Sequence, residues 1–97
     1  MDAETARSVA SYLGKARLER VPLEELDSRL APGDEDTAYI VQDALHEWLT
    51  EAGKGPVSGH KIGCTTPIMQ RFLDIDNPCA GGVFEPTVHQ RSGTFEF

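Results

Sequence analysis

The chain has 97 residues, and its 16 aspartates and glutamates outnumber its 9 lysines and arginines, which gives a net charge of −7. Nucleic acids and anionic membrane surfaces are bound through clustered basic residues, so this balance argues against both as partners. No apolar run is long enough to cross a membrane, and no signal-like apolar segment follows Met1. We therefore predict a cytoplasmic globular protein that does not bind a membrane.

The first predicted helix covers residues 2–20. Its apolar side chains fall on one face at helical spacing, namely Ala6, Val9, Ala10, Leu13 and Ala16. Gly14 lies inside this pattern and weakens the helix. Pro22 ends it, because proline disfavours helical geometry for the residue before it. Residues 22–30 add at most one amphipathic turn through three leucines.

The strongest predicted helix opens at residues 34–36. These three acidic residues complement the positive end of a helix dipole, and either Asp34 or Asp36 can serve as the N-cap. Apolar side chains follow at 3.6-residue spacing up to Trp48 and Leu49, and Gly53 stops the helix. We expect residues 1–55 to form a helical N-terminal segment.

The second half of the chain predicts strands and a short helix. Residues 57–62 alternate weakly, as a strand does, and Thr66 with Pro67 opens a helix that ends near residue 73. Gly81 and Gly82 predict a turn that leads into two strand-like residues, and the tail 93–97 alternates like a strand. The predicted fold class is therefore α+β.

Lys61 is the candidate chemical group of this half. It lies between Gly59 and Gly63, so a ligand can approach the backbone beside it closely. The N–H groups at the start of the following helix, near Thr65 and Thr66, favour a carboxylate or a phosphate. From spacing alone, a solvated lysine beside a strand, a turn and a helix is the simpler interpretation.

Several short motifs follow one another along this half: residues 59–63, Thr65 with Thr66, Met69 with Gln70, residues 75–78, and Gly81 or Gly82. In this order they resemble the 2-keto-4-pentenoate hydratase and 4-oxalocrotonate decarboxylase family, within the fumarylacetoacetate hydrolase superfamily. The resemblance covers roughly residues 20–97 and includes an upstream match at residues 38–42. His60 stands where the family usually has tyrosine, and Cys64, Cys79 and Ala80 also depart from its pattern.

The resemblance implies a fold in which N-terminal helices precede the first strands of a fumarylacetoacetate-hydrolase-like β fold. Residues 56–97 would then be the start of the catalytic β domain, incomplete here. The family holds magnesium or manganese through a Glu-x-Glu pair and a further acid, which correspond to positions just beyond Phe97. Glu96 stands alone, so no metal ligand is assigned in this chain, and we expect the chain alone to bind no metal.

The implied activity is that of a hydro-lyase acting on a 2-oxo-4-enoic acid, such as 2-hydroxypenta-2,4-dienoate in the catabolism of aromatic compounds. Lys61 would be catalytic, stabilising charge or transferring protons. Gly63, Thr65 and Thr66 would bind the small 2-oxo acid. The protein would form a homo-oligomer or need a missing C-terminal part.

Three alternatives stay open at this point. Decarboxylases of the 4-oxalocrotonate type share the motif, so residues 1–97 do not separate water addition from loss of carbon dioxide. A non-catalytic remnant or assembly module would associate through the face of Val41, Leu45 and Trp48. A small zinc module would use His60, Cys64 and Cys79, although the chain lacks the close-spaced ligand pairs typical of such sites.

Overall fold

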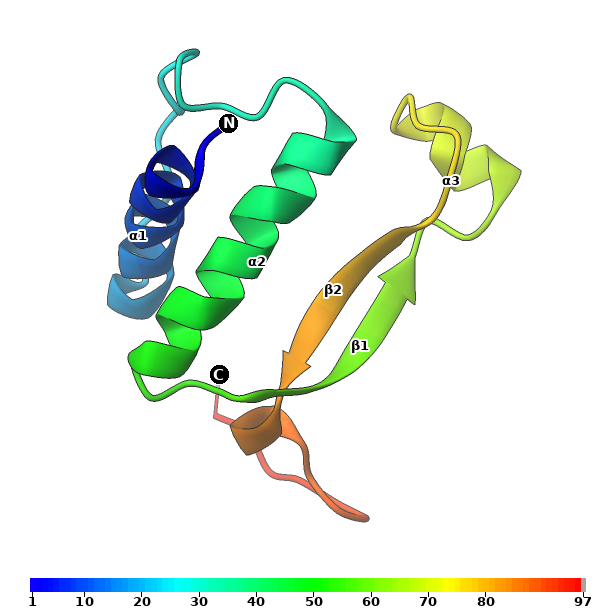
Figure 1. The fold of residues 1–97 in the computed structure, drawn as a ribbon. Helices are drawn as coiled ribbons and strands as arrows, with labels where there is room; N and C mark the ends of the chain where they lie inside the picture. The colour runs from blue at the N-terminus through cyan, green and yellow to red at the C-terminus, as the bar shows by residue number, and fades with distance from the viewer. Residues whose placement is uncertain (97) are drawn as a thin grey trace. The chain divides into compact units, whose positions relative to one another are not determined.

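The computed structural model describes residues 1–96 and falls into two compact units, residues 1–54 and the part that follows from Gly55. The first unit contains the helices α1 (Ala3–Glu19) and α2 (Glu35–Glu51). The second contains β1 (Val57–Gly63), α3 (Pro67–Phe72), β2 (Cys79–Phe84) and a short 3-10 helix, η1 (Glu85–Thr87) (Figure 1). The predicted α+β class is confirmed. No helix within residues 1–96 is long and apolar enough to cross a membrane.

Helix α1 follows the predicted boundaries because its two ends are capped. The Asp2 carboxylate accepts a hydrogen bond from the Thr5 amide at 2.7 Å, and this bond lowers the pKa of Asp2. At the other end Arg20 adopts the left-handed conformation, with φ of 56°. The Val21 amide then donates to the Ala16 carbonyl at 3.1 Å, which satisfies one of the last carbonyls of the helix.

Asp34 is the N-cap of helix α2, which settles the choice between the two predicted caps. The Asp34 carboxylate accepts from the Thr37 amide at 2.8 Å, and hydrogen bonds from the side chain and backbone of Thr37 lower the pKa of Asp34. Gly53 ends the helix as predicted, with φ of +88°, and the Lys54 amide donates to the Leu49 carbonyl at 2.8 Å. Glycine suits this position because other residues rarely adopt positive φ.

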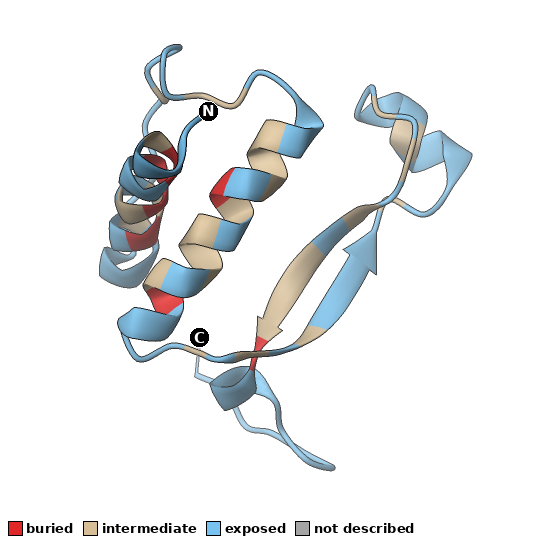
Figure 2. Cartoon of the chain, in the orientation of Figure 1, coloured by how far each residue is buried: buried red, intermediate tan, exposed pale blue. Residues whose placement is uncertain are grey.

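The two helices run in the same direction, and residues 20–34 carry the chain back between them (Figure 1). A helix of this length is about 25 Å long, so two parallel helices need a long connection. The core lies where the helices face each other, and it consists of Ala6, Val9, Ala10, Val41 and Leu49 (Figure 2).

Residues 22–30 form no helix, and the expectation was at most one turn. One turn closes at Asp27, whose carbonyl accepts from the Leu30 and Ala31 amides at 2.8 and 3.0 Å and whose carboxylate accepts from the Arg29 amide at 2.9 Å. In the expected assembly face, Val41 is buried and both Leu45 and Trp48 are half-buried, and association through this face stays a prediction.

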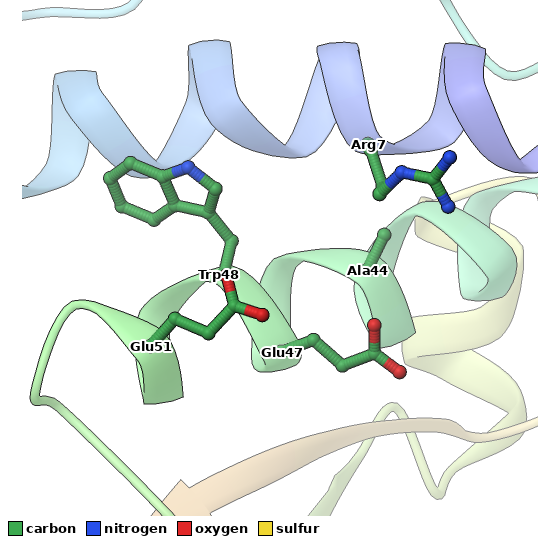
Figure 3. Close-up of a pocket in the computed structure, with 5 residues that line it drawn as sticks. All are labelled: Arg7, Ala44, Glu47, Trp48 and Glu51. Atoms are coloured by element: carbon green, nitrogen blue, oxygen red, sulfur yellow. The ribbon is translucent and has the colours of Figure 1, made fainter.

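Gly14 interrupts the helix pattern for a packing reason. It is buried in α1, and a Cβ atom at this position would overlap ring carbons of Trp48. Figure 3 shows the Trp48 indole reaching from α2 to α1, beside a shallow hollow that is also lined by Arg7, Ala44, Glu47 and Glu51. The glycine thus costs helix propensity and makes room for the largest side chain of the unit.

The substitution Gly14→Ala tests this packing. Alanine improves helix propensity by about 1 kcal/mol, but overpacking against Trp48 costs about 1–3 kcal/mol, so we expect a less stable chain. Urea unfolding followed by the fluorescence of the single tryptophan measures the difference. Gly33→Ala is the matched control, because nothing lies within 4 Å of a Cβ at Gly33. Equal or higher stability of Gly14→Ala would contradict the described contact.

The second unit is built on one antiparallel pair, β1 with β2. Its register places Gly59 opposite Val83, His60 opposite Gly82, Lys61 opposite Gly81, and Gly63 opposite Cys79. A bulge between Val57 and Gly59 adds one residue to β1. Helix α3 lies in the connection between the strands, so the predicted strand 57–62 and the predicted helix from Pro67 are both confirmed.

The prediction for the glycines was wrong. Gly81 and Gly82 do not form a turn but lie inside β2, each opposite a larger side chain of β1. Glycine inside a strand often marks a close approach by another group. From the sequence alone, such a glycine looks the same as a glycine in a turn. Residues 93–96 form no strand, and Phe97 lies outside the described residues.

Candidate functional site

Lys61 lies in the middle of β1 and is exposed. Gly63 follows two residues later, so both residues point to the same face of the strand, about 7 Å apart along it. Directly across the ladder from Lys61 is Gly81, which has no side chain to cover that face. The lysine is therefore presented on an open face of a two-stranded sheet.

The turn after β1 carries the two predicted substrate-binding threonines. Cys64 adopts φ of 55°, in the left-handed region, so the chain bends immediately after the strand. The Gln70 side-chain amide of α3 donates to the Cys64 carbonyl at 3.0 Å and fixes this bend. Thr65 and Thr66 are both exposed between the strand and the helix.

The start of α3 offers fewer free amides than its sequence suggested. The Thr66 hydroxyl accepts from the Met69 amide at 3.2 Å, as an N-cap does, and Pro67 has no N–H group. Thr66 and Ile68 are left as donors in the first turn of a helix that spans six residues. The structure therefore brings Lys61 and Gly63 onto one face and places Thr65 and Thr66 at the following bend.

The part of the chain that the structure describes contains no recognisable set of metal ligands. Within residues 1–96, no three His, Cys, Asp or Glu side chains come close enough to hold a metal ion. Cys64 and Cys79, which both lie among the described residues, are not joined by a disulfide bond. The zinc module proposed for His60, Cys64 and Cys79 therefore has no support among these residues.

The sequence did not reveal what two residues of this region do in the structure. Gln70 belongs to a recognised motif, but its bond to the Cys64 carbonyl depends on the left-handed bend, which no local pattern predicted. Gly81 was assigned to a turn, and its place opposite Lys61 follows from the pairing register. Alternation in residues 79–84 is too weak to reveal that register.

Taken by themselves, fold and site define an α+β chain in which a β-hairpin with a helical connection presents an exposed lysine. No protein-family model matches the chain. Curated relatives do match it.

The chain is 36% identical over 78 residues to 2-keto-4-pentenoate hydratase 2 of Dechloromonas aromatica, an alignment that covers 79% of this chain and 29% of the relative. It is 33% identical over 81 residues to 2-keto-4-pentenoate hydratase 1 of the same organism, covering 82% of this chain and 30% of the relative. It is 30% identical over 83 residues to 2-keto-4-pentenoate hydratase of Burkholderia vietnamiensis, covering 86% of this chain and 31% of the relative.

The chain is thus a distant homologue of the N-terminal part of 2-keto-4-pentenoate hydratases. It spans less than a third of the length of these curated relatives. The resemblance stated from the motifs is confirmed at this level.

The Gln70 bond gives a testable prediction for the bend. In Gln70→Ala the Cys64 carbonyl loses its donor, and the loss of one such bond costs about 0.5–1.5 kcal/mol. We expect the amides of Thr66 and of residues 68–70 to exchange with solvent several-fold faster, while those of α1 stay unchanged. Hydrogen exchange followed by NMR measures both. Gln90→Ala, at an exposed position, is the control, and unchanged exchange in Gln70→Ala would contradict the described role.

Proposed function

We propose that this chain forms the lysine-bearing N-terminal part of a hydro-lyase that adds water to a 2-oxo-4-enoic acid, such as 2-hydroxypenta-2,4-dienoate. The observation that carries the proposal is the homology to hydratases over a segment that includes Lys61. An alignment that covers 79% of a 97-residue chain includes residues 61–70 wherever it begins. Lys61, Gly63, Thr65, Thr66 and Gln70 therefore all lie within the homologous segment.

The proposed role of Lys61 follows from the chemistry of the substrate class. A dienol of this kind tautomerises to the unsaturated 2-oxo acid. Water then adds across the remaining carbon–carbon double bond, so that its hydroxyl group bonds to one carbon and its proton to the other. Negative charge develops on the oxygen of the enol or enolate, and a lysine ammonium beside it stabilises that charge. A positioned group that also transfers a proton contributes about 10²–10⁴-fold to the rate.

Gly63 and the bend at Thr65 and Thr66 are proposed to hold the substrate carboxylate. Gly63 leaves the backbone accessible beside Lys61, and the exposed threonine hydroxyls are available as donors. Within residues 1–96 no three metal-ligating side chains lie close enough together to hold a metal ion, so no metal ligand is assigned among these residues.

The second unit also carries surface that supports its place in a larger fold. Ile62, Ile68 and Phe72 are exposed to 69%, 71% and 80%, and Phe84 is the buried hydrophobic residue described for this unit. A two-stranded sheet by itself is marginally stable, and both of its edges can accept further strands. We propose that further strands of a fumarylacetoacetate-hydrolase-like fold cover this surface, supplied by a hydratase-length chain or by a second copy.

A chimeric enzyme tests the proposed function. Residues 1–96 replace the homologous segment of 2-keto-4-pentenoate hydratase 2 of Dechloromonas aromatica, and loss of the dienol absorbance of 2-hydroxypenta-2,4-dienoate is followed. We expect turnover, and we expect Lys61→Ala to lower it by about 10²–10⁴-fold because the charged amine is lost. Lys54→Ala, in the exposed segment after α2, is the control for removing a positive charge.

Three other results would change the proposed function. Equal turnover in Lys61→Ala and the parent chimera would remove Lys61 from the mechanism. Release of carbon dioxide from 4-oxalocrotonate, without hydration of the dienol, would assign the decarboxylase activity instead. A folded chimera that is inactive on both substrates would favour an assembly module that uses the exposed surface of the second unit.

A further inference from the structure

Lys61 and Gly81 are direct partners in the β1–β2 ladder. Side chains of directly opposed residues in an antiparallel pair point to the same face of the sheet. Because Gly81 has no side chain, the aliphatic stem of Lys61 lies over its Cα atom. A Cβ atom built on Gly81 would lie 3.2 Å from Cε and 3.6 Å from Cγ of Lys61.

Burial agrees with this contact. Gly81 is half-buried although Lys61 itself is exposed, as expected when a lysine stem covers the neighbouring backbone and its amine remains in solvent. By contrast, a Cβ built on Gly59, two residues before Lys61 on the same strand, would meet only Val83 at 3.9 Å, an ordinary contact distance. The close approach therefore belongs to Gly81 and not to every glycine of the hairpin.

We propose that Gly81 is a positioning residue for Lys61. Because Gly81 has no side chain, the lysine stem lies across β2, and this contact fixes the position of the amine. This inference rests on the proposed function only for its catalytic consequence, since the contact itself is independent of any reaction. Gly59 and Gly63 flank Lys61 in sequence, whereas Gly81 acts from the opposite strand. The direction of the amine is thus set by a residue 20 positions away in the chain.

Glycine is needed at position 81 because of the space that the Lys61 stem occupies, and not because of the backbone conformation. Its φ lies outside the positive range that only glycine adopts readily, so alanine fits the backbone. The atom that an alanine methyl would approach is the far end of a flexible side chain. We therefore expect Gly81→Ala to keep the hairpin folded and to displace the Lys61 stem.

The first test uses NMR on the full 97-residue chain. We expect nuclear Overhauser contacts from the Gly81 Hα protons to the Hγ and Hε protons of Lys61. Gly81→Ala should shift the Lys61 side-chain signals while the backbone signals of β1 and β2 show that the ladder persists, and Gly59→Ala should leave the Lys61 signals in place. Absence of the contacts in the unsubstituted chain would overturn the proposal, as would unchanged Lys61 signals or a lost hairpin in Gly81→Ala.

The second test is a double-mutant cycle on turnover in the chimeric hydratase. Gly81→Ala should lower kcat by about tenfold or more with KM nearly unchanged, because the amine is misplaced. In the Lys61→Ala background, the same substitution should cause no further loss. An equal loss in both backgrounds would show a merely structural role and overturn the proposal. If Lys61→Ala alone has no effect, the proposed function fails, whereas the NMR contact stands or falls separately.

Discussion

The pairing register of β1 with β2 is the constraint on which the site depends. Side chains alternate between the faces of a strand, so a slip of one residue would move Lys61 to the other face and place Gly82 or Ala80 opposite it. In the observed register Lys61 lies opposite Gly81, so no side chain of β2 covers the face beside the amine. The bend at Cys64 and the Gln70 bond then place Thr65 and Thr66 directly after the same strand.

The two units obtain their stability in different ways. Residues 1–54 have capped helices and a small apolar core, with Trp48 fitted over Gly14. The hairpin unit relies on its ladder and on local hydrogen bonds, and large apolar side chains such as Phe72 remain exposed. A hairpin with so little buried apolar surface gains stability from any strand or helix that covers it. That need agrees with the match to curated relatives of which this chain covers less than a third.

Local sequence signals predicted the elements well where the cause is local. Asp34, Gly53 and the Thr66–Pro67 pair act on backbone groups within a few residues, so helix ends could be placed from the sequence alone. Gly81 and Gly14 could not be interpreted this way, because their role depends on a partner distant in sequence. Lys61 was found through its motif, yet the way in which its stem lies on the sheet required the register.

The most direct measurement is the backbone nuclear Overhauser spectrum of the 97-residue chain in solution. The described register predicts cross-strand contacts that join His60 with Gly82 and Ile62 with Ala80. Such contacts would show that Lys61 stands opposite Gly81 in solution, as the arrangement of the site requires. Contacts displaced by one residue, or no contacts between residues 57–63 and 79–84, would contradict the account, because Lys61 would then not stand opposite Gly81.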